Sequence, residues 1–307
     1  MSASSTFNQT QSFLARRFAE AGIRPQQRHG QNFLIDMNLV RLLLQTAEIG
    51  PNDVVLEVGT GTGSLTALMS QVAAAVVTVE IDPHLYQLAS EELIDCPNVT
   101  MLHQDALRNK NALHPVVLAA VAEKMAESPG RRFKLVANLP YCVATPILAN
   151  LLSSQPLPFS MTATIQKEVA ERLIAPPSTK DYSALSIWMQ SQCQVELVRI
   201  MPPSVFWPRP KVDSAIVRIT IDESRRRQIP GLEFFHDFVR AMFFHRRKLL
   251  RSVLESGYKG RLSKQDADQI IAALSLSPTV RAEELDVATM LKLCEQVRAR
   301  VGTSPQP

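Results

Sequence analysis

The four residues Asn138, Leu139, Pro140 and Tyr141 bring an amide, main-chain carbonyls and an aromatic ring together. These groups suit chemistry on the exocyclic amine of a nucleobase, whose lone pair is delocalised into the ring. Acceptors facing both N–H groups would localise that pair, and the Asn138 side-chain oxygen and the Leu139 carbonyl can supply them. Pro140 stiffens the turn, and Tyr141 offers a face for stacking an extruded base. Such a string can also be an ordinary turn, so its surroundings decide.

A glycine-rich loop follows the apolar run over 53–58, with glycines at Gly59, Gly61 and Gly63. Glycines there let the backbone approach a ligand closely. Glu80 lies at the end of the next apolar run, where its carboxylate can accept hydrogen bonds from both hydroxyls of a ribose. The pattern leaves both a nicotinamide dinucleotide and S-adenosylmethionine open. The loop omits the later glycine of the dinucleotide motif, which favours S-adenosylmethionine over the dinucleotide. A plain glycine-rich turn without a ligand is the other alternative.

Asp105 follows a third apolar run and could accept a hydrogen bond from the amino group of an adenosyl ring. Its alternative role is that of a helix-capping or turn aspartate. The position after a strand, in the same place as Glu80 on the run before, favours the binding role.

The elements that must position these residues form an α/β pattern. Short apolar runs at 53–58, 75–79, 99–102 and 133–137 predict buried parallel strands, with helices between them. Such an alternation predicts a doubly wound, Rossmann-like sheet, and ligands bind at the carboxyl ends of its strands. We therefore expect Gly59, Glu80, Asp105 and Asn138 to lie along one edge.

The remainder of the chain is expected to complete two domains. Helical periodicity covers 11–21 and 83–94, residues 194–222 resemble a β-hairpin, and 108–131 are interpreted as a loop insertion with one helix. A length of 307 residues exceeds what one core usually supports. The expected domains are an α/β domain over 1–222 and a smaller all-helical domain over 223–307.

Composition narrows the class of protein. The net charge is +4, and apolar residues make up 46 %, which is ordinary for a globular protein and excludes wholesale disorder. The four cysteines form no C-x-x-C pair, so neither a disulfide framework nor a metal site is expected. No segment has the length and apolarity of a membrane span, and a cytoplasmic monomer is expected.

Basic charge is concentrated in the second domain. Residues 223–261 hold ten Lys and Arg against four Asp and Glu. Five of the basic residues are expected on one helix with Phe243 and Phe244: Arg240, Arg246, Arg247, Lys248 and Arg251. A charge run often means only a solvated helix face. Because no acidic partner is near in sequence, the run instead predicts contacts with RNA phosphates.

Together these motifs resemble the rRNA adenine N6-dimethyltransferases of the KsgA/RsmA type. The matching segments, in order, are residues 30–34, 57–63, 79–82, 104–106, 138–141, 202–214 and 243–251. The resemblance implies a class I methyltransferase that dimethylates two adjacent adenosines in the 3′-terminal hairpin loop of 16S rRNA. It also implies S-adenosylmethionine as methyl donor, no metal, the small ribosomal subunit or its assembly intermediate as partner, and a role in subunit biogenesis.

The resemblance assigns roles residue by residue. Residues that match those contacting the methyl donor or its surroundings are Asn32, Leu34, Gly59, Glu80, Asp105 and Asn138. Gly61 and Gly63 belong to the same loop. Phe206 matches a residue that stacks on the target base opposite Tyr141, and its alternative role is a core aromatic. His29, Thr60 and the long segment 108–131 depart from the usual pattern.

Three other functions remain open from the sequence. A 23S rRNA methyltransferase of the macrolide-resistance type shares the glycine loop but usually carries isoleucine in place of Leu139. A ribosome-assembly or transcription factor could use the same fold without catalysis, although intact Asn138 and Tyr141 argue against a purely binding role. A nicotinamide dehydrogenase is disfavoured by the loop spacing.

Overall fold

The computed structural model describes residues 10–20, 22, 31–229 and 231–302, and the chain divides into two compact units. The first unit comprises residues 1–170 and 196–220, and the second comprises residues 171–195 and 221–307. The division near residue 221 lies close to the expected boundary at 222. Residues 171–195, however, group with the C-terminal helices, so the second unit is built from two separate stretches of chain.

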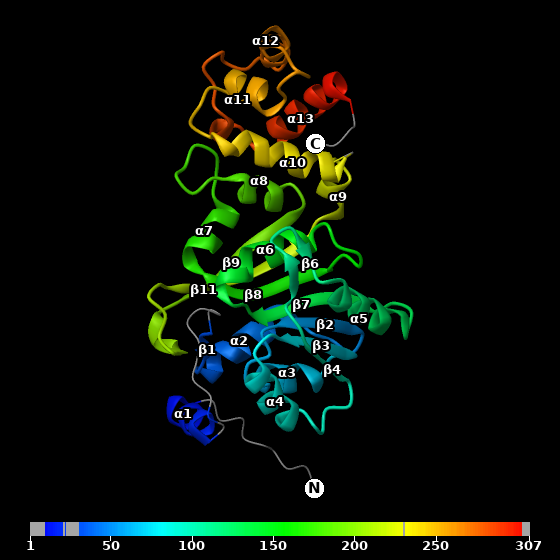
Figure 1. Ribbon diagram of the computed structural model, residues 1–307, viewed down its shortest axis with the longest axis vertical. Helices are drawn as coiled ribbons and strands as arrows, with labels where there is room; N and C mark the ends of the chain where they lie inside the picture. Colours follow the sequence, from blue (N-terminus) through cyan, green and yellow to red (C-terminus); the bar gives the residue numbers. More distant parts are fainter. Residues whose placement is uncertain (1–9, 21, 23–30, 230, 303–307) are drawn as a thin grey trace. The chain divides into compact units, whose positions relative to one another are not determined.

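A seven-stranded sheet forms the centre of the first unit, in the order β4-β3-β2-β7-β8-β11-β9 (Figure 1). The five strands from β4 to β8 run parallel, and β11 pairs antiparallel with β8. The strands are β2 (Asp53–Val58), β3 (Ala75–Glu80), β4 (Val99–His103), β7 (Arg132–Asn138), β8 (Ser160–Gln166), β9 (Cys193–Met201) and β11 (Ser214–Ile221). The predicted parallel α/β sheet is thereby confirmed, and the residues of the expected hairpin form the adjacent strands β11 and β9 at its edge.

Helices connect the strands and cover the sheet, as parallel neighbours require crossovers. They are α2 (Met37–Ala47), α3 (Ser64–Ser70), α4 (Pro83–Glu92), α5 (Pro115–Ala126) and α6 (Tyr141–Leu151), whereas α1 (Gln11–Glu20) packs through Phe18 against Phe33 and Trp207. Val55 and Val76 lie in a core cluster with residues of α2 and α3. Because side chains alternate along a strand, Val54 and Leu56, which are also fully buried, face the opposite side.

The segment 108–131 is not a surface loop insertion. A short hairpin of β5 (Leu107–Asn109) and β6 (Ala112–Leu113) leads into α5, which contacts β2, β3 and β7. Val117 and Val121 of α5 are fully buried. The sequence interpretation was wrong here because the apolar positions of this Ala-rich helix are sheet-facing positions, and only the tertiary fold distinguishes the two cases.

A two-stranded antiparallel ribbon joins residues 33–34 to the Pro-rich segment. Strand β1 (Phe33–Leu34) pairs antiparallel with β10 (Phe206–Trp207), next to the short 3₁₀ helix η2 (Pro203–Val205). Phe18 of α1 packs edge-on against Phe33, with ring centroids 5.1 Å apart. The predicted helix near 11–21 is therefore confirmed. Gly30 and His29, which precede β1, lie outside the described residues.

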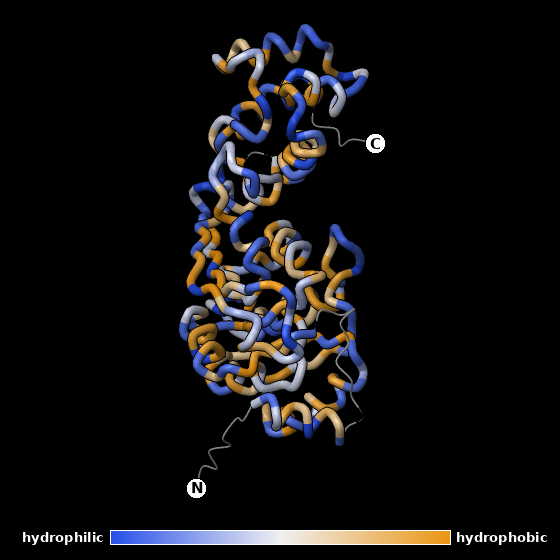
Figure 2. Tube along the Cα trace, turned by 90° about the vertical axis from the view of Figure 1, so that its left-hand side faces the viewer, coloured by the Kyte–Doolittle hydropathy of each residue, from blue (hydrophilic) through white to orange (hydrophobic). Residues whose placement is uncertain are grey.

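The second unit is helical. Its elements are the end of α7 (Lys167–Ile174), α8 (Ala184–Gln190), α9 (Glu223–Arg226), α10 (Leu232–Phe244), α11 (Leu250–Gly257), α12 (Lys264–Ala273), η3 (Ala282–Glu284) and α13 (Val287–Val301). Hydrophobic and hydrophilic residues alternate within the turns of these helices (Figure 2), the pattern of helices with one buried face. The fully buried Tyr182 donates its hydroxyl hydrogen to the Leu285 carbonyl at 2.8 Å, joining the two stretches of the unit.

One expected helix is in fact two. Helix α10 ends at Phe244 and α11 begins at Leu250, so the basic residues 246–248 lie in the connection between them. Lys248 N–H donates to the His245 carbonyl at 2.8 Å within this turn. Sequence periodicity did not reveal the break because the segment contains no glycine or proline to mark it.

Candidate donor and base site

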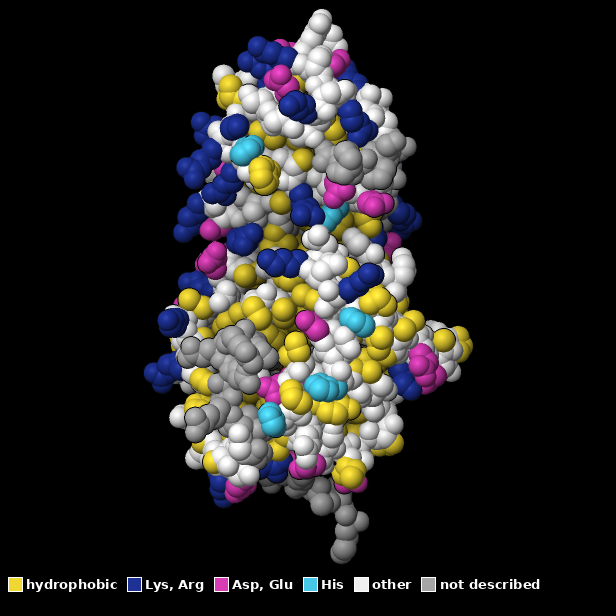
Figure 3. All heavy atoms as spheres, in the orientation of Figure 1, with side chains coloured by type: hydrophobic (Ala, Val, Ile, Leu, Met, Phe, Trp, Pro, Cys, Tyr) yellow, Lys and Arg dark blue, Asp and Glu magenta, His cyan; other side chains and the backbone are white. Residues whose placement is uncertain are grey.

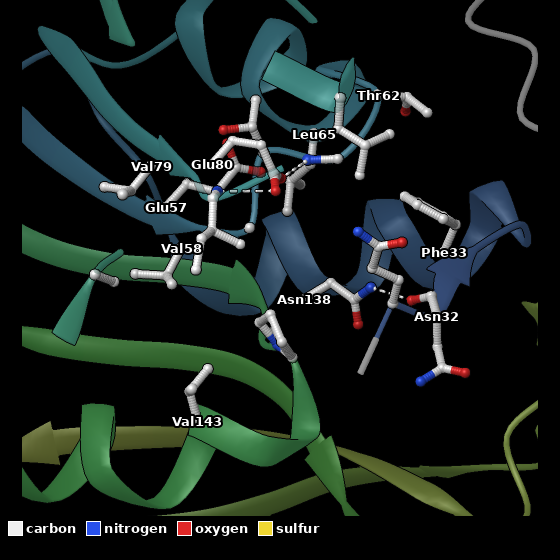
Figure 4. Close-up of a pocket in the computed structure, with 18 of the residues that line it drawn as sticks. Asn32, Phe33, Glu57, Val58, Thr62, Leu65, Val79, Glu80, Asn138 and Val143 are labelled. Atoms are coloured by element: carbon white, nitrogen blue, oxygen red, sulfur yellow. Dashed lines mark hydrogen bonds between the residues drawn. The ribbon is translucent and has the colours of Figure 1, made fainter. Parts of the chain in front are cut away.

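A cavity of about 300 Å³ lies at the carboxyl ends of the parallel strands of the first unit (Figure 4). Eight of the residues that the sequence predicted to bind or act line it: Asn32, Leu34, Gly59, Gly61, Glu80, Asp105, Asn138 and Pro140. The predicted convergence of four strand ends is confirmed, because the parallel order β4-β3-β2-β7 places those ends along one edge.

The glycine loop presents backbone to this cavity. Gly59 and Gly61 have φ values of +87° and +59°, a region that side chains rarely adopt. A Cβ on Gly59 would lie 3.3 Å from the Pro140 ring, and one on Gly61 would lie 3.1 Å from the Phe33 ring. Gly63 precedes α3 and packs toward Leu93 instead, and it is not among the lining residues. Gly63 caps the start of α3 in a left-handed backbone conformation, with φ of +83°.

Glu80 is held in place by main-chain donors. One carboxylate oxygen accepts from the Gly61 N–H at 3.0 Å, and the other accepts from the N–H groups of Ile81 at 3.0 Å and Asp82 at 2.9 Å. The residue is only 5 % exposed, and burial raises the pKa of its carboxyl. A fixed carboxylate that faces the cavity can accept hydrogen bonds from vicinal hydroxyls without first having to be ordered.

Asp105 combines the two roles that the sequence left open. One of its carboxylate oxygens accepts from the Leu107 N–H at 2.9 Å, which is the turn role. The residue is exposed and also lines the cavity. The turn therefore orients a carboxylate that retains acceptor capacity toward the cavity.

The amide of Asn138 has a defined orientation. Its nitrogen donates to the main-chain carbonyl of Asn32 at 2.8 Å, as the dashed line in Figure 4 shows. Since this bond uses the amide nitrogen, the amide oxygen is the atom left to accept. The expected segment around Asn32 thus acts on Asn138 through its backbone, a contact that joins residues 106 positions apart in the chain.

The neighbours of Asn138 form the start of α6. Leu139 is buried, and its N–H donates to the Thr164 carbonyl of β8 at 3.2 Å. Tyr141 is half-buried, its hydroxyl lies 2.5 Å from that of Ser214, and burial raises the pKa of its phenol. Of the four residues, Asn138 and Pro140 line the cavity, whereas Leu139 and Tyr141 lie beside it.

Phe206 is part of the core. Its side chain is 2 % exposed and belongs to the same cluster as Leu34, to which it is paired across β1 and β10. In this conformation the ring cannot stack on a base, and the alternative role weighed from the sequence is the one observed. Its physical cause is that a strand pair buries alternate side chains.

Glu57 was missed in the search for site residues, although it lines the cavity. It is 1 % exposed and accepts hydrogen bonds from the hydroxyls of Thr66 and, at 2.7 Å, Thr78. Thr60 lies 2.7 Å from the Thr78 hydroxyl and extends this buried network. Burial raises the pKa of the Glu57 carboxyl to about 8. Its sequence signal is an acidic residue that interrupts the apolar run after Asp53, two positions before the glycine loop.

The predicted RNA-binding residues have different environments. Arg240, Arg247 and Lys248 are exposed. Arg246 instead donates to the carbonyls of Lys180 and Tyr182, at 2.8 and 3.1 Å, and lies 3.5 Å from Glu283. Arg251 forms an ion pair with Asp268 at 3.4 Å.

No acidic residue occurs from 238 to 254 in the sequence, but Arg246 and Arg251 do have acidic partners in space. Their partners are brought in from distant parts of the chain. Lys and Arg side chains nevertheless gather over the helices of the second unit in Figure 3.

No group of three or more His, Cys, Asp or Glu in residues 10–20, 22, 31–229 and 231–302 could hold a metal ion. In the same ranges, no helix is long and apolar enough to cross a membrane.

The parallel sheet, the glycine loop after β2 and the acidic residue ending β3 define a class I S-adenosylmethionine-dependent methyltransferase fold. A family model described as ribosomal RNA adenine dimethylase matches residues 23–297. The chain belongs to this ribosomal RNA adenine dimethylase family.

Two relatives at the sequence level share one description. "Ribosomal RNA small subunit methyltransferase A" of Geobacillus kaustophilus is 38 % identical over 275 residues, covering 89 % of this chain and 91 % of the relative. The protein of the same description from Clostridium acetobutylicum is 36 % identical over 287 residues, covering 93 % and 98 %.

Among solved structures, a dimethyladenosine transferase from Plasmodium falciparum superposes with a TM-score of 0.70 at 25 % identity, covering 86 % of this chain and 97 % of that one. The 23S rRNA methyltransferase ErmE superposes with a TM-score of 0.61 at 24 % identity, covering 86 % and 99 %. The likeness to ErmE concerns the fold alone.

Proposed function

We propose that this protein is an rRNA (adenine-N6,N6)-dimethyltransferase that modifies two adjacent adenosines in the 3′-terminal hairpin loop of 16S rRNA. The observation that carries the proposal is the fixed amide of Asn138, whose oxygen is left as an acceptor in the same cavity as Glu80. The small-subunit description of the relatives supports the choice of RNA. Dimethylation of this loop would be a step of small-subunit biogenesis.

The cavity fits S-adenosylmethionine. Gly59 and Gly61 leave space that a Cβ would fill, Glu80 offers a fixed carboxylate for the ribose hydroxyls, and Asp105 offers an acceptor for the adenine amino group. Asn32 and Leu34 close the side of the cavity formed by β1. When bound, the donor supplies an electrophilic methyl group on a sulfonium centre.

The target amine would be gripped by the turn that ends β7. The amide oxygen of Asn138 accepts from one N–H and the main-chain carbonyl of Leu139 from the other, which concentrates the lone pair on nitrogen. The Leu139 N–H, which belongs to the preceding peptide unit, donates to the Thr164 carbonyl, and Pro140 restricts the backbone of Leu139, so this acceptor has a defined orientation before substrate binds. Tyr141, fixed through its hydroxyl by Ser214, supplies a face for the base.

The chain needs no strong general base for this reaction. A nitrogen that has gained a methyl group is positively charged and loses its proton readily to water. Catalysis is then positioning and electrostatics by Asn138 and the turn around it, and no step calls for a metal.

RNA would be held by the exposed basic side chains of the second unit. Arg240, Arg247 and Lys248 are available for phosphate contacts that position RNA without reading sequence. Arg246 and Arg251 act mainly inside the unit. We further propose that the protein works as a cytoplasmic monomer on a small ribosomal subunit or its assembly intermediate.

Incubation with tritiated S-adenosylmethionine and unmethylated small subunits tests the function directly. Nucleoside analysis of the 16S rRNA should recover the label in N6,N6-dimethyladenosine. Large subunits serve as the matched substrate and should remain unlabelled. Label in 23S rRNA, or in a nucleoside other than dimethyladenosine, would contradict the proposal.

A further inference from the structure

Phe244 is a solvent-facing aromatic at the end of α10. Its side chain is 81 % exposed, the largest fraction among large apolar residues in the part of the chain the structure describes. Phe235 and Phe238 on the same helix are 1 % and 0 % exposed. A phenylalanine ring in water lacks the stabilisation that burial would bring. The exposed ring is therefore available to gain that stabilisation by contact with a binding partner.

At the corner where α10 ends, one phenylalanine and one arginine pack inward, and the residue after each of them faces solvent. Phe243 packs inward, with its ring centroid 5.9 Å from that of Tyr182, whereas Phe244 points outward. Arg246 is bound to the carbonyls of Lys180 and Tyr182, whereas Arg247 is exposed. The inward members anchor the corner, so the outward members are presented from a fixed backbone.

The surroundings of Phe244 are positively charged. Arg240 lies one helical turn earlier and therefore on the same face of α10. Arg247 and Lys248 follow in the connection and are exposed. No acidic residue occurs anywhere from 238 to 254. Of the described residues 221–229 and 231–302, Phe244 is also the one exposed large apolar side chain.

We propose that Phe244 is a stacking platform for an unpaired base of RNA, with Arg240, Arg247 and Lys248 contacting the adjoining phosphates. The inference rests on the proposed function, because it takes RNA as the substrate. The Phe244 ring contacts the His245 ring edge-to-face, with centroids 4.8 Å apart, and is still 81 % exposed. An exposed ring among basic residues fits a nucleotide, which offers a π face and an anion together. An apolar protein partner would instead fit a contiguous apolar patch.

Binding of the full-length protein to a synthetic RNA hairpin with an unpaired loop tests this inference. Phe244→Ala should raise the dissociation constant about tenfold, which is within the range for loss of one base stack. Phe244→Leu should raise it similarly because it keeps an apolar group but no aromatic face, whereas Phe244→Tyr should retain binding. Ile94→Ala, at a site 80 % exposed on the first unit, is the matched control and should bind as the parent does.

A second probe separates stacking from apolar contact. In Phe244→Trp, the hairpin should quench fluorescence beyond the background of Trp188 and Trp207, and a fully paired duplex of the same length should not. Unchanged hairpin affinity in Phe244→Ala, full binding by Phe244→Leu, or weakened binding only to whole subunits would overturn the inference. The last result would indicate a protein contact. Methylation of 16S rRNA is assayed separately, so either idea can fail while the other stands.

Discussion

The amide of Asn138 shows how a single side chain is prepared for its role. A free asparagine can turn either its oxygen or its nitrogen toward a ligand. Here the Asn32 carbonyl takes the amide nitrogen at 2.8 Å, so the oxygen is the group available for an incoming amine. This contact costs nothing at the moment of reaction because it exists before substrate arrives.

Asn138→Ala should lower kcat for methyl transfer by about 10²–10³-fold, the range seen when one pre-positioned polar contact to a reacting centre is removed. RNA affinity should change little, because the basic residues that contact phosphate lie elsewhere. Single-turnover methylation and RNA binding are measured on the same preparation. Asn150→Ala, on α6, is the matched control. A kcat equal to that of the parent would refute the acceptor role.

Glu80→Gln should weaken binding of S-adenosylmethionine by about 10²-fold, since hydrogen bonds to a charged acceptor are worth about 1.5–3 kcal/mol. Burial raises the pKa of this carboxyl, so parent affinity should fall as the pH is lowered toward that pKa. The variant, which cannot ionise, should lack that pH dependence. Calorimetry over a pH series measures both effects. Glu91→Gln, at an exposed position of α4, serves as control, and a pH-dependent Glu80→Gln would argue against the ribose contact.

At the scale of elements, β2, β3 and α3 are joined through Glu57. Its carboxyl group accepts hydrogen bonds from the hydroxyls of Thr78 on β3 and Thr66 on α3, behind the glycine loop. An acidic residue at that depth favours its protonated form, and burial raises its pKa to about 8. The loop backbone thus sits on a polar network whose charge depends on pH.

The folded-state pKa of Glu57 lies above its unfolded value. The contribution of this carboxyl to the free energy of unfolding is therefore fully present below about pH 4.5 and is lost as the pH rises toward about 8. Relative to Glu57→Gln, the parent should therefore lose up to about 5 kcal/mol across that window. Urea unfolding of both proteins at several pH values measures the difference. Glu255→Gln, an exposed site on α11, should show no such trend. A pH-independent difference would mean that the Glu57 carboxyl has the same pKa in the folded and unfolded states.

At the scale of the whole molecule, the cavity and the exposed basic residues proposed to contact RNA belong to different units. The cavity is lined by residues 31–143 of the first unit, and the exposed basic cluster lies in the second. Such a division lets one unit supply positioning by charge while the other supplies the reaction site. The second unit takes in residues 171–195 as well, so its fold depends on contacts such as Tyr182 to Leu285.

The double variant Arg247→Ala/Lys248→Ala should flatten the salt dependence of RNA binding. Two lost phosphate contacts should reduce the slope of log K against log salt by about 1.4 for single-stranded RNA. Lys259→Ala/Lys264→Ala removes the same charge from exposed positions away from the connection after α10 and should leave the slope nearly unchanged. An unchanged slope in the first pair would place the RNA surface elsewhere.

The sequence by itself determined the parallel sheet, the glycine loop and the edge at which Glu80, Asp105 and Asn138 meet. These features are local: apolar runs of strand length and residue types at strand ends carry them. Only the tertiary structure decided that Phe206 is buried, that α5 covers the sheet, and that Arg246 binds backbone while Arg247 faces water. Each of these depends on partners far away in the chain, which neither spacing nor composition encodes.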